Sequence, residues 1–153
     1  MNAVRSPYRS KFQEAIAELL DERGVAYTHE GEAIEYRKPE RTAKYTPPFA
    51  LCTGIILQQK GRFVTADRQK HILIKQQFPN REVRFIFWDA QARISKLSDT
   101  TYAAWCDRYG FTWTCYKANR KAKLPVVPLE WTRNAVLEQN PQGPIPFPLP
   151  LRS

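Results

Sequence analysis

The sequence predicts a single α/β (α+β) domain in which helices flank one mixed central sheet. A length of 153 residues is typical of one domain, and a hydrophobic content of 42% supplies a core. Helical and strand patterns also alternate along the chain, in the order helix, three strands, helix, strand, helix. Such an order favours one sheet covered by helices.

The first helix is predicted over residues 7–23. Ser6 is the expected N-cap, Pro7 suits the first helical position, and Gly24 ends the pattern. Residues 25–30 alternate in polarity, which predicts a strand.

A hairpin is expected in the middle of the chain. Residues 37–44 are polar and interrupted by Pro39, so they are predicted to form a connector. The apolar runs 49–52 and 55–60 are separated by Thr53 and Gly54, a spacing typical of a hairpin.

The second half of the chain predicts two helices and one strand. Asp67 is the expected cap of a helix over 68–77, and residues 83–88 form a buried strand. Thr100 is the expected cap of a helix over 101–109, which Gly110 ends.

The C-terminal part divides into a basic segment and a proline-rich one. Residues 113–123 are predicted to form a loop or arm. From Pro141 onward, five of thirteen residues are proline, which excludes a helix or a central strand. We therefore expect a domain over 1–134 and an extended tail over 135–153.

Charge points to a polyanionic partner. The net charge of +9 excludes an acidic mimic of DNA. Residues 37–75 contain nine basic and two acidic residues, whereas residues 1–36 contain four and seven. Any one such residue is more often part of a solvated surface, but this concentration of positive charge favours phosphate binding.

Other classes of protein receive no support from the sequence. No apolar run is long enough for a membrane helix and the first residues lack a signal peptide's apolar stretch, so a cytoplasmic location is expected. Three cysteines without CxxC spacing support neither a disulfide framework nor a zinc ribbon. We expect reduced thiols at Cys52, Cys106 and Cys115, and core positions for Trp88, Trp105, Trp113 and Trp131.

The candidate site lies in residues 45–61. On a strand, Gln58 and Lys60 share one face, and Pro48 precedes the other hairpin strand. Metal-dependent nucleases place an Asp at the start of one strand and an acid-x-Lys triplet on the next. There the carboxylates hold Mg²⁺ and the lysine serves the attacking water.

Six stretches of the sequence match a known family pattern, namely YRSKFQ at 8–13, YTPPF at 45–49, GIILQQKG at 54–61, DRQKHILIKQQFP at 67–79, TTYAAWCDRYG at 100–110 and LPVVPLEW at 124–131. Through them the chain resembles the bacteriophage endonuclease I family, which comprises Holliday-junction resolvases with the PD-(D/E)XK nuclease fold. The resemblance implies that core fold, Mg²⁺-dependent cleavage and an intertwined homodimer joined through residues 35–44.

Three of the four catalytic positions depart from the family pattern. The family pattern has Glu where this chain has Gln13, Asp where it has Pro48 and Glu where it has Gln58. Only the lysine, Lys60, is retained. Because Mg²⁺ usually needs one or two carboxylates, we expect no metal and no cofactor here. Glu14 is rotated about 100° away from position 13 on the helix. The acids that stay open as substitutes are Glu30, Glu32 and Glu35.

Basic residues around these positions are the predicted DNA contacts. Arg9 and Lys11 lie near a helix N-terminus, where phosphates bind readily. His71 resembles a family position, four residues from both Asp67 and Lys75, and a lone surface histidine is the alternative. The full set is Arg9, Lys11, Arg37, Lys38, Arg41, Lys44, Lys60, Arg62, Arg68, Lys70, His71 and Lys75.

Three functions follow from these observations. The first is a catalytically inactive pseudo-resolvase that binds branched or structured DNA through a basic channel. The second is a phage host-takeover protein that binds and inhibits a host DNA-processing enzyme, with the tail or residues 113–123 as its contact. The third is a weak, metal-dependent junction-resolving endonuclease.

Overall fold

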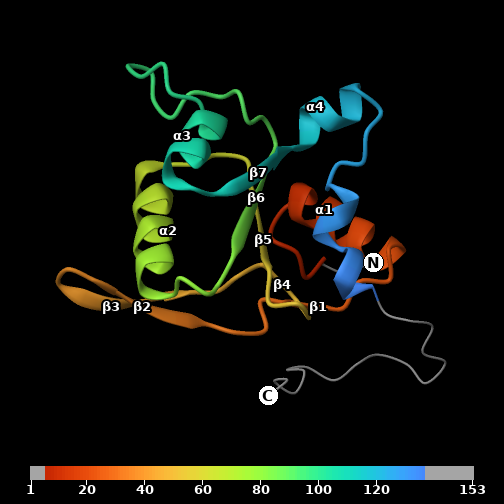
Figure 1. The fold of residues 1–153 in the computed structure, drawn as a ribbon, viewed down its shortest axis with the longest axis horizontal. Coiled ribbons are helices and arrows are strands. Elements are labelled where there is room, and N and C mark those ends of the chain that lie inside the picture. Colours follow the sequence, from red (N-terminus) through yellow and green to blue (C-terminus); the bar gives the residue numbers. More distant parts are fainter. Residues whose placement is uncertain (1–5, 137–153) are drawn as a thin grey trace, which may run out of the picture.

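The computed structural model describes residues 6–136 of the chain. Its centre is a five-stranded sheet in the order β1-β4-β5-β6-β7, in which the first two pairings are antiparallel and the last two parallel (Figure 1). The predicted mixed sheet is therefore confirmed. The strands are β1 (Tyr27–His29), β4 (Phe49–Leu51), β5 (Ile56–Lys60), β6 (Val83–Phe87) and β7 (Thr112–Cys115).

Helices cover both faces of this sheet. Helix α1 (Lys11–Glu22) lies on one face, and α2 (Thr65–Gln77) and α3 (Tyr102–Tyr109) lie on the other (Figure 1). Alternation along β5 divides the core accordingly, since Ile56 packs with the α2 and α3 side chains and Leu57 with those of α1. Gln58 thus shares the face of Ile56.

Three predicted helix starts are wrong by a few residues. Ser10, and not Ser6, caps α1, because its side chain accepts from the Gln13 N–H at 3.0 Å. Thr101 replaces Thr100 as the cap of α3 by the same type of bond, to the N–H of Ala104. Helix α2 begins at Thr65, so Asp67 belongs to its first turn and is not the cap. In each case the residue before the helix has an extended backbone, and the sequence pattern alone does not locate that boundary to within a few residues.

The predicted connector is in fact a hairpin. Strands β2 (Ile34–Lys38) and β3 (Arg41–Tyr45) pair antiparallel from Ile34 opposite Tyr45 to Lys38 opposite Arg41. The hairpin extends away from the main sheet (Figure 1). At its outer edge, the Gln77 carboxamide accepts from the Arg37 N–H and donates to the Arg37 carbonyl, both at 2.6 Å.

Residues 113–123 also differ from the predicted loop. They contain most of β7 and helix α4 (Tyr116–Lys121), and two short 3₁₀ turns follow, over Leu129–Trp131 and Arg133–Ala135. Trp105 and Trp131 are buried as expected, whereas Trp88 is 44% exposed, so its predicted core position is wrong. The proline-rich tail from Pro141 lies outside the described residues.

Two other expectations concern thiols and membranes. Cys106 and Cys115 are buried thiols, as predicted. Within residues 6–136, none of the helices combines the length and the apolar character that crossing a bilayer requires.

Candidate functional site

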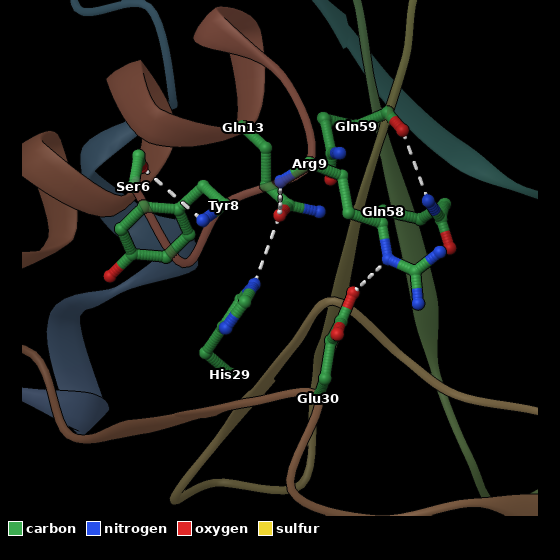
Figure 2. A network of polar contacts seen from close by, with 8 residues as sticks. All are labelled: Ser6, Tyr8, Arg9, Gln13, His29, Glu30, Gln58 and Gln59. Carbon is green, nitrogen blue, oxygen red and sulfur yellow. Dashed lines mark hydrogen bonds and ion pairs between the residues drawn. The ribbon is translucent and has the colours of Figure 1, made fainter. Parts of the chain in front are cut away.

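Helix α1 and strands β4 and β5 bring the four family positions to one region. Gln13 comes from α1, and Gln58 and Lys60 lie on β5. Strand β4 pairs Phe49 with Leu57 and Ala50 with Ile56, so the next step of this register places Pro48 opposite Gln58. Figure 2 shows Gln13 and Gln58 in one close-up view, where Gln13 is bonded to Arg9 and His29 and Gln58 to Gln59.

The Gln13 side chain is buried, and its carbonyl oxygen accepts two hydrogen bonds. It is 2% exposed, and its Oε1 accepts from the Arg9 N–H and from His29 Nε2, each at 2.9 Å (Figure 2). These bonds require His29 to carry its proton on Nε2. Because an amide oxygen has two lone pairs, both acceptor sites of Gln13 are occupied.

Gln58 is held in a similar way. It is 7% exposed, its Oε1 accepts from the Tyr45 hydroxyl at 2.7 Å, and its Nε2 donates to the Gln59 carbonyl at 3.0 Å. Burial raises the pKa of Tyr45, so this hydroxyl stays protonated and remains a donor at neutral pH. The amide of Gln58 is thereby fixed between a buried phenol and its own strand.

Pro48 contributes no side-chain ligand. It is buried, and its carbonyl oxygen accepts from the Glu30 N–H at 3.1 Å. This bond continues the ladder between β1 and β4 by one residue. The position that carries a carboxylate in the family pattern is therefore part of the backbone scaffold here.

Lys60 is half-buried and forms an ion pair with Asp67. Its Nζ lies 3.3 Å from Asp67 Oδ2, and Lys70 Nζ lies 3.9 Å from Asp67 Oδ1. Burial and the nearby Lys60 lower the pKa of Lys70. One carboxylate thus compensates two neighbouring ammonium groups, which leaves this corner of the site cationic.

The three acids left open by the sequence are each paired with a cation. Glu30 binds the Arg9 guanidinium (Figure 2). The other two pairs are Glu32 with Arg81, at 2.6 Å, and Glu35 with Lys44, at 3.9 Å. In the described part of the chain, no three His, Cys, Asp or Glu side chains are grouped so that they could hold a metal ion.

Two predicted DNA contacts are buried in the fold, so a surface role for them is wrong. Arg68 is 8% exposed and donates to the Phe63 and Ile94 carbonyls and to Thr65 Oγ1. It ties the start of α2 to the following loops. His71 is 0% exposed and lies among aromatic rings.

The other predicted contacts are accessible to different degrees. Lys75 is exposed, although its Nζ donates to the Gly110 carbonyl at 2.7 Å and lies over the Phe111 ring. Half-buried positions are occupied by Lys38, Lys60 and Lys70. The exposed residues are Arg9, Lys11, Arg37, Arg41, Lys44, Arg62 and Lys75.

Sequence reasoning missed the side chains that occupy the changed site. Tyr45 and His29 supply the donors to Gln58 and Gln13. Alternation was the available signal for His29, since it places His29 and Tyr27 on one face of β1. Tyr45 gave no comparable signal, because it lies at the end of β3, a strand that was not predicted, and its partner Gln58 is thirteen residues away.

Buried His71 predicts acid-sensitive stability. Its ring lies 5.0 Å from that of Tyr45 and 4.8 Å from that of Phe85, and neither ring nitrogen has a hydrogen-bond partner. Burial, followed by the charges of Lys60 and Lys70, holds its pKa well below the usual value. The unfolded chain binds the proton more readily, so stability present above pH ~6.5 falls as pH decreases, by up to about 1.4 kcal/mol per unit.

The measurement is the free energy of unfolding in urea at pH 7.5 and 5.5. We expect the unaltered chain to lose more stability between these values than His71→Phe, which has no proton to bind. Equal losses in the two proteins would contradict a buried neutral histidine.

Comparison with known proteins agrees with the family resemblance of the sequence motifs. The family model described as phage endonuclease I matches residues 1–143. The chain is 34% identical over 103 residues to endodeoxyribonuclease 1 of Enterobacteria phage T3, covering 67% of this chain and 68% of that protein. It is 28% identical over 140 residues to endonuclease I of Escherichia phage T7, covering 92% and 84%. With the nuclease-like sheet and the four positions gathered as described, the chain belongs to the phage endonuclease I family.

Proposed function

We propose that this family member binds DNA and has lost metal-dependent cleavage. The observation that carries the proposal is the state of the three changed positions. Gln13 and Gln58 are neutral amides whose oxygens already accept hydrogen bonds, and Pro48 has no side-chain ligand. In place of carboxylates, the site therefore holds two neutral amides, each with its own set of hydrogen bonds.

The energetics of metal binding support this proposal. Mg²⁺ usually binds through one or two carboxylates and keeps several waters. To ligate through Gln13, it would have to displace two partly buried donors, and each buried donor left without a partner costs up to about 1–3 kcal/mol. A single neutral carbonyl does not offset that loss together with the dehydration of the ion.

The remaining charge supports DNA binding. The T3 relative is named an endodeoxyribonuclease, so DNA is the substrate class that family membership suggests. Loss of the carboxylates also removes negative charge from the region that phosphates would approach. Lys60 and its neighbour Lys70 then act as phosphate contacts, and the exposed residues of the basic set extend the contact surface. Phosphate contacts of this type fix the position of the protein on the DNA backbone. A preference for branched DNA would arise from the shape of the DNA.

A homodimer is also part of the proposal, and its support is the family resemblance alone. In the single chain, residues 35–44 already pair with each other as a hairpin. An intertwined dimer would have to open this hairpin and replace its pairs with pairs to the other copy. Light scattering after gel filtration distinguishes monomer from dimer.

The experiment that tests the proposal is a titration of a labelled four-way junction and a matched linear duplex. Each DNA is tested with and without Mg²⁺ or Mn²⁺, on native and denaturing gels. We expect a shift that favours the junction, weakens steeply with salt and is accompanied by no cleavage.

The other outcomes are equally informative. Metal-dependent cleavage that disappears in Lys60→Ala would contradict the loss of activity and favour the weak endonuclease. Absence of any shift at low salt would contradict DNA binding and favour the host-enzyme inhibitor.

A further inference from the structure

Trp88 is a large aromatic side chain at the surface beside the changed site. It follows β6 directly and is 44% exposed. Its ring stacks on that of Tyr116, with centroids 5.1 Å apart and planes 21° from parallel. Phe12 packs edge-on against both rings, at 5.5 and 5.2 Å. The three rings support one another, so the exposed indole has a fixed orientation.

Backbone bonds attach this aromatic cluster to the site. The Trp88 N–H donates to the Lys60 carbonyl at 3.0 Å, and the Trp88 carbonyl accepts from the Lys117 N–H at 3.1 Å. Phe12 immediately precedes Gln13 on α1. The position of the cluster is therefore set by the elements that carry the family positions.

The surroundings of the cluster are positively charged. Helix α4 begins with Tyr116, and the Arg120 guanidinium lies 5.9 Å from its ring centroid. No acidic residue occurs between positions 112 and 123. Four exposed cations lie on α4 or just after it, namely Lys117, Arg120, Lys121 and Lys123.

Aromatic faces beside fixed cations are suited to single-stranded nucleic acid. Every base has a π-face that can stack on an indole, and cations along the strand neutralise its phosphates. In an intact duplex the bases stack on each other, so such a surface selects an unpaired base. An acidic peptide would satisfy the cations but would supply no flat ring for Trp88.

We propose that Trp88, backed by Tyr116, is a stacking platform for an unpaired nucleobase of a DNA strand whose phosphates lie along α4. The platform adds recognition of unpaired bases, as at a flap or an opened branch, to the phosphate contacts of the neighbouring site. This inference rests on the proposed function, since it requires the chain to bind DNA.

The test compares a blunt duplex with the same duplex carrying an unpaired thymidine overhang of about ten nucleotides. This length lies within the roughly 4–16 nucleotides that one single-strand-binding OB fold covers. For Trp88→Ala we expect the affinity for the overhang DNA to fall by about five- to a hundredfold, the range for one stacked base. Binding of the blunt duplex should change less than twofold, and Trp88→Phe should keep most of the affinity. Replacing Lys117, Arg120 and Lys121 by Gln should weaken both DNAs and reduce the salt dependence.

A matched control is available on another helix. Tyr109 on α3 is also an exposed aromatic residue with a cation, Arg108, beside its ring. Tyr109→Ala should leave both affinities unchanged. As a direct readout, irradiation of an overhang containing 5-iododeoxyuridine should cross-link to the peptide that contains residue 88.

The outcomes separate this inference from the proposed function. If the unaltered chain binds neither DNA at low salt, the proposed function is wrong and the platform with it. If it binds the duplex, but Trp88→Ala weakens both DNAs equally or neither of them, only the platform is overturned. Cross-linking solely to another peptide would also overturn it.

Discussion

Returning carboxylates to the three changed positions should give the chain Mg²⁺-dependent cleavage of junction DNA. The variant combines Gln13→Glu, Pro48→Asp and Gln58→Glu, and retains Lys60. A bound metal stabilises charge in the transition state by several kcal/mol, so we expect a rate roughly a hundredfold or more above that of the unaltered chain. The measurement is single-turnover cleavage of a labelled four-way junction.

Two variants control for this gain of function. Adding Lys60→Met to the triple variant should abolish cleavage without removing a metal ligand. Restoring positions 13 and 48 alone should give little activity, because β5 then offers only the amide of Gln58. Thermal melting shows whether Pro48→Asp preserves the fold. If the unaltered chain already cleaves as fast as the triple variant, the proposal that the missing carboxylates abolish cleavage is wrong.

The second large effect is expected at Phe63, between β5 and α2. The ring is fully buried, and its centroid lies 5.1 Å from that of Phe85, 5.2 Å from that of Phe87 and 4.9 Å from that of Trp105. Phe63→Ala should lower the free energy of unfolding by about 3–5 kcal/mol, because the cavity it leaves cannot close. Urea unfolding followed by circular dichroism measures the loss, which is a large part of the usual 5–15 kcal/mol for a domain.

An exposed residue provides the comparison for Phe63. Leu97 is fully exposed, and Leu97→Ala should change the stability by less than about 0.5 kcal/mol. A loss below 1 kcal/mol for Phe63→Ala would contradict a tightly packed aromatic core at this point. The same loss of packing should reduce DNA binding indirectly, because Phe63 joins the strand of Lys60 to the helix of Asp67.

Local patterns were sufficient where both the period and the turn signal were clear. The hairpin of β4 and β5 was predicted because Thr53-Gly54 separates two apolar runs, and Gly54 does adopt a positive φ of 92°. Strand β6 was predicted because nearly all its residues are apolar, as expected for a strand covered on both faces. The family positions were located because the motifs around them are local in sequence.

The remaining features depend on tertiary packing. In the β2–β3 hairpin, charges on one face obscured an alternation in which Ile34, Tyr36 and Tyr45 are buried. In α2, Arg68, His71 and Ile74 lie at helical spacing on the packed face, and the sequence suggested instead a basic outer face. The sequence reasoning assumed that polar side chains face water. The fold instead buries Arg68, whose partners include backbone carbonyls, and His71, which lies among aromatic rings.

The contact between Gln77 and Arg37 has a consequence for self-association. An unpaired strand edge offers free N–H and C=O groups on which another chain can add a strand. Here the side-chain carboxamide of Gln77 takes the place of that missing peptide, since it satisfies both backbone groups of Arg37. The projecting hairpin is thereby protected from intermolecular strand addition at this residue, which helps the chain to resist aggregation.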